Sequence, residues 1–185
     1  MTDPNSAPRN LESAGENPSL VEWLRECLDQ DELLAKEAGR VRGELTGAHW
    51  HWEDNGSDEP LSVDFGLEYL NFDDSSSWAR SVSLRSVEEV PTTSVGPLPE
   101  FIIHGEDEMK SVHAAHIVAW DPARVLAEIA AKRELLDLHR ATARSNSRGR
   151  RECITCFETE TPCRTLLILA QPYRSRPGFR KEWWR

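Results

Sequence analysis

Apolar residues recur at helical spacing directly after Ser19, and they mark the first predicted element. The recurring positions are Leu20, Leu24, Cys27, Leu28, Leu34, Ala38 and Val41. Ser19 is a favourable N-cap, and Glu22 stands three residues later, where its carboxylate can complete a capping box. The pattern therefore predicts an amphipathic helix over residues 20–42, with Cys27 packed in the core.

A second long helix is predicted over residues 121–140. Asp121 is a favourable N-cap, and Pro122 suits the first helical position, where its missing N–H costs no hydrogen bond. The apolar stripe of this helix is about 80° wide. Its members are Val125, Ile129, Leu136 and His139. The histidine therefore lies at the end of the buried face.

Two shorter helices are expected on either side of that one. The first lies within EDEMKSVHAAHIVAW, residues 106–120. The last is expected to have Thr161 as its N-cap and Pro162 at the first helical position, and Pro172 is expected to end it.

Between Gly47 and Gly105 the pattern changes to short, partly alternating segments. These segments are HWHW, LSVDFGLEYLNF, WARSVSLRSVEEV and EFIIHG, and they are separated by Gly, Asn, Asp, Ser and Pro. Such a pattern predicts a small antiparallel meander of three to five strands, with turns at DNGSDEP and DDSSS.

Length and composition favour one globular domain. The chain has 185 residues, of which 38% are hydrophobic, and this is enough for a single core over residues 19–185. Residues 1–18 are rich in polar residues and proline without periodicity, which predicts a flexible tail. No apolar run approaches the roughly 20 residues that cross a bilayer, and no signal peptide is recognisable. We therefore expect a cytosolic protein that does not bind membranes.

Three of the four cysteines lie in one short stretch, CITCFETETPC, residues 153–163. A disulfide, a redox couple and a metal site are the alternatives. In a reducing cytosol, clustered cysteines are more often metal ligands or redox groups than crosslinks. A thioredoxin-like couple would place C-x-x-C at the start of a helix after a strand, whereas CITC follows a basic linker. The pattern therefore favours a metal site.

Four residues can complete such a site. Cys153 and Cys156 have the C-x2-C spacing, Cys163 falls in the first turn of the last predicted helix, and His139 closes the preceding helix. Three thiolates and one imidazole suit one tetrahedral structural zinc ion per chain. The metal ion would link the end of the helix at residue 139 to the loop and the helix start at residues 153–163, so that residues 139–163 form one zinc-stabilised part of the domain. The predicted fold is thus α+β: an N-terminal helix, a β-meander, then C-terminal helices closed by a zinc-binding loop.

Five stretches carry a further signal: LVEWLRECLDQDELLAKEA, HWHW, HIVAWDPARVLAEIAAKRELLDLH, PCRT and PYRSRPGFRKEWW. Together they resemble an uncharacterised family of short proteins from actinobacteria and their phages. The resemblance extends from about Leu20 to Trp184. It implies a shared fold, a zinc site and an origin in a phage or a mobile region, but no established activity.

The charge is divided unequally along the chain. Residues 1–110 carry 8 Lys and Arg against 24 Asp and Glu, whereas residues 111–185 carry 14 against 8. The two halves can simply face each other within one fold. Alternatively, the basic half binds a partner, since Arg and aromatic side chains often anchor interfaces. The candidate partner-binding residues are Arg148, Arg150, Arg151, Arg174, Arg176, Arg180, Trp183 and Trp184.

These observations support three hypotheses for function. We expect a non-enzymatic, zinc-stabilised interaction or regulatory protein with a protein partner. The alternative is a small zinc-stabilised nucleic-acid-binding protein, whose arginines grip phosphates while the aromatic rings stack on bases. The third is a metal-dependent hydrolase built from His49, His51, His113 and His116 with Glu53 or Asp107. No nucleophile motif, phosphate-binding glycine loop or H-E-x-x-H supports an enzyme.

Overall fold

The computed structural model describes residues 19–41, 44–45, 47–55, 60–61, 81–90, 96–106, 109, 111–140, 149, 152–159 and 162–184. The predicted tail at residues 1–18 lies outside the described residues. So do the DDSSS turn and the middle of the DNGSDEP turn.

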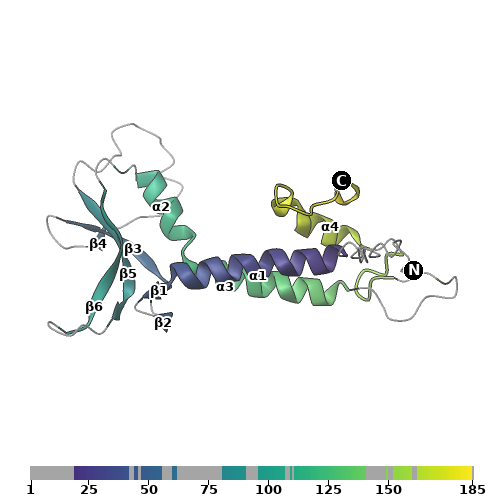
Figure 1. The fold of residues 1–185 in the computed structure, drawn as a ribbon, viewed down its shortest axis with the longest axis horizontal. Coiled ribbons are helices and arrows are strands. Elements are labelled where there is room, and N and C mark those ends of the chain that lie inside the picture. The colour runs from purple at the N-terminus through teal and green to yellow at the C-terminus, as the bar shows by residue number, and fades with distance from the viewer. Residues whose placement is uncertain are drawn as a thin grey trace, which may run out of the picture.

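The described elements form an elongated α+β molecule (Figure 1). A β-sheet and one helix lie at one end, two long helices run side by side to the other end, and the last helix packs there. In chain order the elements, with η for a 3₁₀ helix, are α1 (Leu20–Ala38), β1 (Arg40–Val41), β2 (Glu44–Leu45), β3 (Trp50–Asp54), β4 (Pro60–Leu61), β5 (Val82–Val90), β6 (Leu98–Glu106), α2 (Ser111–Ala119), α3 (Pro122–Leu138), α4 (Arg164–Ala170), η3 (Gln171–Tyr173) and η4 (Lys181–Trp183).

Helix α1 begins where the capping box predicted. The Ser19 hydroxyl accepts a hydrogen bond from the Glu22 N–H at 3.3 Å, and the Glu22 carboxylate accepts one from the Ser19 N–H at 2.7 Å. The predicted end at residue 42 is wrong, because the helix stops at Ala38. Gly39 donates its N–H to the Ala35 carbonyl and accepts the Gly47 N–H at 3.0 Å. The chain therefore turns at Gly39 into the β1–β2 ribbon.

Helices α1 and α3 form an antiparallel pair. Arg25 contacts Asp137 at 3.1 Å, and Arg133 contacts both Asp29 at 2.6 Å and Glu32 at 2.5 Å. Hydrogen bonds from Arg133 and then Lys36 lower the pKa of Glu32 to about 2. Exposed ion pairs of this kind contribute little stability individually. Their role is to select the register in which the apolar faces of the two helices meet.

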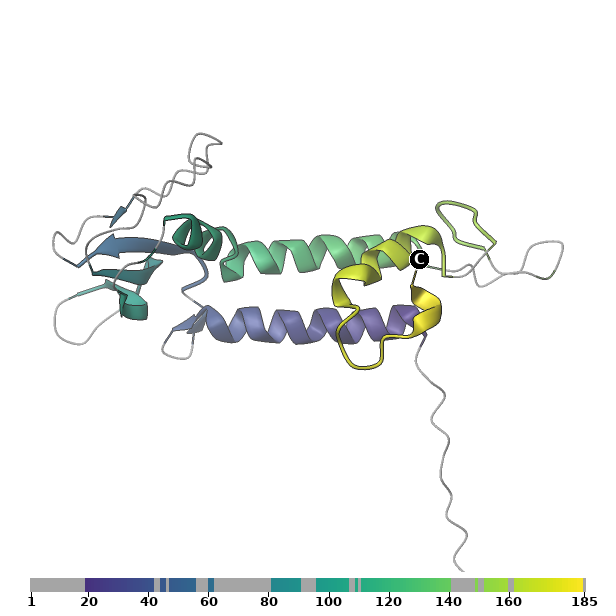
Figure 2. The same ribbon diagram turned by 90° about the horizontal axis from the view of Figure 1, so that it is seen from above.

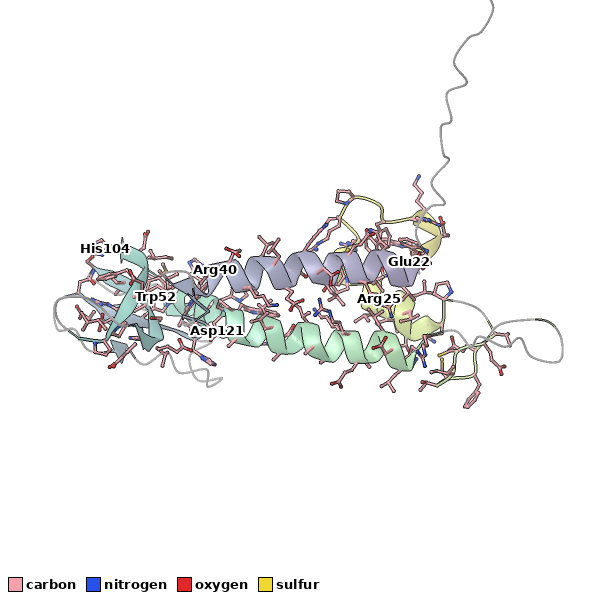
Figure 3. The ribbon with its side chains drawn as sticks, turned by 60° about the horizontal axis from the view of Figure 1, so that its bottom comes forward. Glu22, Arg25, Arg40, Trp52, His104 and Asp121 are labelled. Carbon is pink, nitrogen blue, oxygen red and sulfur yellow. The ribbon has the colours of Figure 1, made fainter. Side chains whose placement is uncertain are left out.

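The start of α3 confirms its predicted cap. The Asp121 side chain accepts a hydrogen bond from the Arg124 N–H at 2.9 Å, and Pro122 is the first helical residue. Figure 3 labels Asp121 and Arg40 at the end of the helix pair that meets the sheet, and Glu22 at the opposite end. His139 follows the last helical residue as the C-cap.

The predicted meander is a four-stranded antiparallel sheet with the strand order β4-β3-β5-β6. Trp52 lies at its centre, is fully buried, and donates its indole N–H to the Ala114 carbonyl of α2 at 3.1 Å. Helix α2 begins at Ser111 rather than near residue 106, because Glu106 pairs with Val82 as the last residue of β6. The sheet and α2 share one hydrophobic cluster.

A second cluster lies along the helix pair. Its buried members include Trp23, Leu24, Cys27, Leu28, Ile129, Leu136, Leu166, Leu167 and Trp183. The C-terminal residues close this cluster over α1 (Figure 2). The Trp23 indole donates to the Pro177 carbonyl at 2.9 Å, and its ring contacts the rings of Phe179 and Trp183.

Gly178 is the residue that permits this closure. Its φ of +84° lies in the left-handed region that favours glycine. A Cβ at this position would lie 2.9 Å from the Trp23 indole nitrogen. Both the backbone conformation and the close approach of Trp23 therefore require glycine.

We predict that Gly178→Ala lowers the free energy of unfolding by about 2–4 kcal/mol, because the left-handed backbone and the displaced Trp23 both add cost. Gly96→Ala is the matched control, since Gly96 has a φ of +90° and its Cβ would meet no atom within 4 Å. That variant should lose only about 1 kcal/mol. Urea denaturation measures both. Equal losses would contradict the proposed contact with Trp23.

Candidate metal centre

The end of α3, the cysteine loop and the start of α4 bring four metal-ligating side chains together. They are His139, Cys153, Cys156 and Cys163, and one ligand atom from each lies within 4.8 Å of the other three. The His139 Nδ1 is 3.6 Å from the Cys153 sulfur and 3.7 Å from the Cys163 sulfur. Figure 2 shows the described part of this loop beyond the end of α3 and beside the start of α4.

The spacing of these atoms fits a tetrahedral metal ion. Zinc lies about 2.3 Å from a thiolate and about 2.0 Å from an imidazole, so sulfur and nitrogen at neighbouring corners are about 3.5 Å apart. The two measured sulfur–nitrogen distances are close to that value. Cys153 and Cys163 are almost completely buried, whereas His139 and Cys156 are half-buried. The donor set and the burial therefore suit a single metal ion enclosed by the protein.

Hydrogen bonds within the loop hold the cysteines in place. The Cys153 N–H bonds to the Glu158 carbonyl, and the Phe157 N–H bonds to the Cys153 carbonyl, both at 3.0 Å. Two bonds attach the loop to the end of α3. The Ile154 N–H donates to the Arg140 carbonyl at 3.2 Å, and the Thr155 hydroxyl donates to the Leu138 carbonyl. The loop is thus fixed to the helix that carries His139.

The start of α4 differs from the predicted one. Cys163 is the N-cap, with an extended backbone at φ −69° and ψ 164°, and Arg164 is the first helical residue. The prediction that Thr161 caps the helix and that Cys163 lies in its first turn is therefore wrong. The Glu158 carboxylate accepts the Arg164 N–H at 2.8 Å and so caps the helix from outside the predicted position. The thiol of Cys163 consequently sits at the helix entrance.

The surroundings of the thiols shift their acidity in opposite directions. Burial alone would raise the pKa of Cys153, but hydrogen bonds from the backbone N–H groups of Cys156 and Thr155 outweigh it and lower the pKa to about 7. Burial and the neighbouring thiols raise the pKa of Cys163 to about 11. Crowded thiols cannot all ionise without a cation, so this arrangement favours metal binding.

The fourth cysteine has a different environment. Cys27 is buried on the face of α1 that packs into the helix-pair cluster, as the sequence predicted. Burial raises the pKa of its thiol. Its carbonyl accepts a hydrogen bond from Arg176 at 2.9 Å. Cys27 is therefore a core residue.

The described histidines of the hydrolase hypothesis do not lie together in one metal-binding group. Within the described ranges, His139 and the three cysteines are the one group of metal-ligating side chains. His49 instead contacts Glu88 at 2.5 Å, and this hydrogen bond raises the pKa of the His49 imidazole. Burial lowers the pKa of His51. His113 and His116 are exposed on α2.

Some of the predicted partner-binding residues lie outside the described residues, and others are packed against α1. Arg148, Arg150 and Arg151 lie outside the described residues. Trp183 is 4% exposed and packs on Trp23, while Arg176 bonds to Cys27 and forms an ion pair with Asp31. These two side chains hold the C-terminal segment on α1.

The other members of that group reach the surface. Trp184 is 56% exposed, and the Arg174 guanidinium lies 5.2 Å from the centre of its ring. Arg180 covers Trp183 at 5.0 Å. The structure thus brings Arg174 and Trp184 together on an exposed surface next to the buried Trp183.

Sequence reasoning gave no role to Thr155 or Glu158, although both hold the cysteine loop in place. Thr155 attaches the loop to α3, and Glu158 caps α4. Single polar residues in a loop have no periodicity, so the sequence held no signal for these contacts.

Among the described residues, none of the helices combines the length and the apolar character that a membrane span requires.

The comparisons with known proteins support the resemblance seen in the sequence. No curated protein and no solved structure gives a significant match. The model of a family of unknown function, DUF6221, matches residues 17–185. The predicted helices, the cysteine loop and the closing aromatic segment all fall inside that match. The chain therefore belongs to DUF6221.

Proposed function

We propose that His139, Cys153, Cys156 and Cys163 bind one zinc ion and that this ion has a structural role. The observation that carries the proposal is the approach of three sulfur atoms and one imidazole nitrogen to within 4.8 Å in a largely buried position. Four protein ligands complete the tetrahedral coordination of zinc. No position is then left for a water or a substrate, so the site is suited to stability rather than to hydrolysis.

The structural effect of such a metal ion follows from the elements that supply its ligands. The metal ligands come from the end of α3, the cysteine loop and the entrance to α4. Helix α4 and the segment after it cover α1 through Leu166, Leu167 and Trp183. A metal ion that joins α3 to α4 therefore holds this cover in place.

We further propose that the protein acts by binding a partner protein in the cytosol and that it has no catalytic activity. Arg174 and Trp184 support this idea, because an exposed tryptophan beside an arginine is a common anchor at protein interfaces. None of the four cysteines forms a disulfide, as is usual in a reducing compartment. A regulatory role and an origin in an actinobacterium or a phage belong to the same proposal.

Nucleic-acid binding is the second candidate function. The observation that favours it is also the Arg174–Trp184 pair, since such a pair can contact a phosphate and stack on a base. Against it stands the excess of acidic residues in residues 1–110, which would repel a long duplex. The two candidates differ in how binding responds to nuclease and to salt.

We predict that protein purified without chelator or oxidant contains about one zinc ion per chain, because three thiolates and one imidazole form a closed, high-affinity site. Elemental analysis by mass spectrometry measures the content. A content below about a third of an equivalent would refute the site.

Two cysteine variants provide a matched test of the ligand assignment. Cys163→Ser should lose the zinc and about 3 kcal/mol or more of unfolding free energy, because folding and metal binding are coupled. Cys27→Ser should retain one zinc and lose about 1–2 kcal/mol, the cost of burying a hydroxyl. Denaturation combined with metal analysis measures both quantities. Equal metal content in the two variants would exclude Cys163 as a ligand.

The partner contact is tested with Trp184→Ala. The ring is mostly exposed, so the variant should keep its zinc and unfold within about 0.5 kcal/mol of the wild type. Capture of a partner from a lysate of the source organism should nevertheless fall about tenfold. Nuclease treatment should leave capture by the wild type unchanged. If nuclease abolishes capture, and binding to short DNA or RNA falls steeply with salt, nucleic acid is the partner instead.

A further inference from the structure

The three cysteines of the metal centre differ in how far solvent reaches them. Cys153 and Cys163 are each 1% exposed, whereas Cys156 is half-buried. A cysteine that ligates a metal ion is deprotonated, and oxidants attack exposed thiolates first. The remaining cysteine, Cys27, is 3% exposed and is not among the proposed ligands. Cys156 is therefore the thiolate that a small oxidant reaches first.

The turn that carries Cys156 also supplies a second thiol. Two backbone hydrogen bonds of 3.0 Å close this turn, from the Cys153 N–H to the Glu158 carbonyl and from the Phe157 N–H to the Cys153 carbonyl. The sulfur atoms of Cys153 and Cys156 lie within 4.8 Å of each other. Cysteines spaced C-x2-C are the pair that disulfide oxidoreductases join reversibly. A disulfide between Cys153 and Cys156 is therefore possible with little movement of the backbone.

Cys163 is a less suitable partner for Cys156. It is the N-cap of α4, which is a separate element, and it is almost completely buried. The sulfur atoms of a disulfide are about 2.0 Å apart, so the loop and the helix entrance would have to move towards each other. Cys153 and Cys156 lie in one turn, and rotation of their side chains supplies most of the approach. Oxidation should therefore join two positions within the loop.

Hydrogen peroxide supplies a balanced route to this disulfide. The Cys156 thiolate attacks one peroxide oxygen, the O–O bond breaks, and the products are a sulfenic acid and hydroxide. The Cys153 thiolate then attacks the Cys156 sulfur, the S–S bond forms, and the S–O bond breaks to release a second hydroxide. The two thiolates lose two electrons in total, and one molecule of peroxide gains them.

The disulfide would leave too few ligands for zinc. His139 and Cys163 are the two that remain, whereas a structural zinc site has four protein ligands. Hydrogen bonds to the end of α3 would still hold the loop. A disulfide within the loop makes no link to α4, and the exposed hydrogen bond from Arg164 to Glu158 is a weak substitute for the metal ion. Oxidation would therefore free the start of α4 and leave the loop on α3.

We propose that the metal centre is a peroxide-sensitive switch, in which oxidation of Cys156 and Cys153 to a disulfide releases the metal ion and loosens the cover that α4 places over α1. A dithiol reverses the step, because it reduces the disulfide and is itself oxidised. In a reducing cytosol, a transient disulfide of this kind is typical of redox sensing. The switch rests on the proposed zinc site, since an oxidant can release only a metal ion that is bound.

The first experiment measures zinc release from the full chain, purified with its zinc and freed of reductant. About 1 mM hydrogen peroxide should release at least about 80% of the zinc within about 30 min, relative to a peroxide-free sample, as a chromogenic chelator reports. Dithiothreitol with added zinc should restore about one equivalent. Protein that keeps its zinc under peroxide overturns the switch but leaves the structural site intact. Protein that contains no zinc when purified refutes the proposed function, and the switch with it.

Glutamates in the sequence allow the disulfide to be located. Cleavage after glutamate separates residues 153–158, which hold Cys153 and Cys156, from residues 161–182, which hold Cys163. Free thiols are alkylated before the peroxide-treated protein is digested. Mass spectrometry should then find an unalkylated peptide 153–158, lighter by two hydrogen atoms than its reduced form, and an alkylated Cys163. A disulfide that joins the two peptides would contradict the proposed pairing.

Two variants test whether Cys156 is the thiolate that peroxide attacks. Cys156→His offers an imidazole in place of the exposed thiolate, so four ligands remain, and peroxide should release the zinc at least about tenfold more slowly. Cys27→Ser is the matched control and should release zinc within about twofold of the wild-type rate, because Cys27 is a core residue. Release from Cys156→His at the wild-type rate would exclude Cys156 as the reactive cysteine.

A measurement on the wild type keeps this assignment testable if Cys156→His does not hold zinc. A cyclic 1,3-dione traps sulfenic acids, and fragmentation of the labelled peptide identifies the cysteine that carries it. During the first minutes of peroxide treatment the label should lie on Cys156. A label that lies first on Cys153 or Cys163 overturns the order of attack.

Hydrogen exchange reports the change in conformation. In the oxidised protein the amides of α4 should exchange at least about fivefold faster than in the zinc-bound protein, because the start of α4 has lost its link to α3. Strand β5 is the internal control, since the cluster around Trp52 and Leu84 includes no metal ligand. Its amides should change less than about twofold. Unchanged exchange in α4, or an equal change in both elements, would overturn the proposed loosening.

Discussion

The approach of three thiols and one imidazole at the end of α3 is the interaction on which the C-terminal half depends. Hydrogen bonds from Ile154 and Thr155 set the loop against α3, and the cluster of ligand atoms joins it to α4. The cover that α4 provides for α1 follows from this junction.

The helix pair separates two apolar clusters that are stabilised in different ways. At one end, Trp52 and Leu84 of the sheet pack on Ala114 of α2 without any metal-ligating group. At the other end, the cluster around Trp23 includes Cys153 and Cys163. Loss of a bound metal ion would therefore destabilise the end of the helix pair that carries Cys153 and Cys163 before it destabilises the sheet end.

Much of this arrangement could be predicted from local patterns. The capping box at Ser19, the Asp121-Pro122 start of α3 and the four clustered ligands are all encoded by residues close in sequence, or by an unusual residue type at a recognisable spacing. The errors have local causes as well. The helical pattern includes Glu106, but this residue pairs in the sheet with Val82, 24 residues earlier. No local pattern predicts that the Glu158 carboxylate accepts the Arg164 N–H at the start of α4. The sequence could not predict that Trp183 is buried and Trp184 is exposed. The two residues are neighbours, and only tertiary packing distinguishes them.

The hydrogen bond from Trp23 to Pro177 joins residues 154 positions apart, and this has a consequence for synthesis. Helix α1 leaves the ribosome with Trp23, Leu24 and Cys27 on one face, and the segment around Pro177 that covers this face is translated only after the residues between them. Contacts of such long sequence separation form slowly, and the apolar surfaces that wait for them are prone to aggregate. The N-terminal helix is therefore the segment of the nascent chain for which protection by a chaperone would matter most.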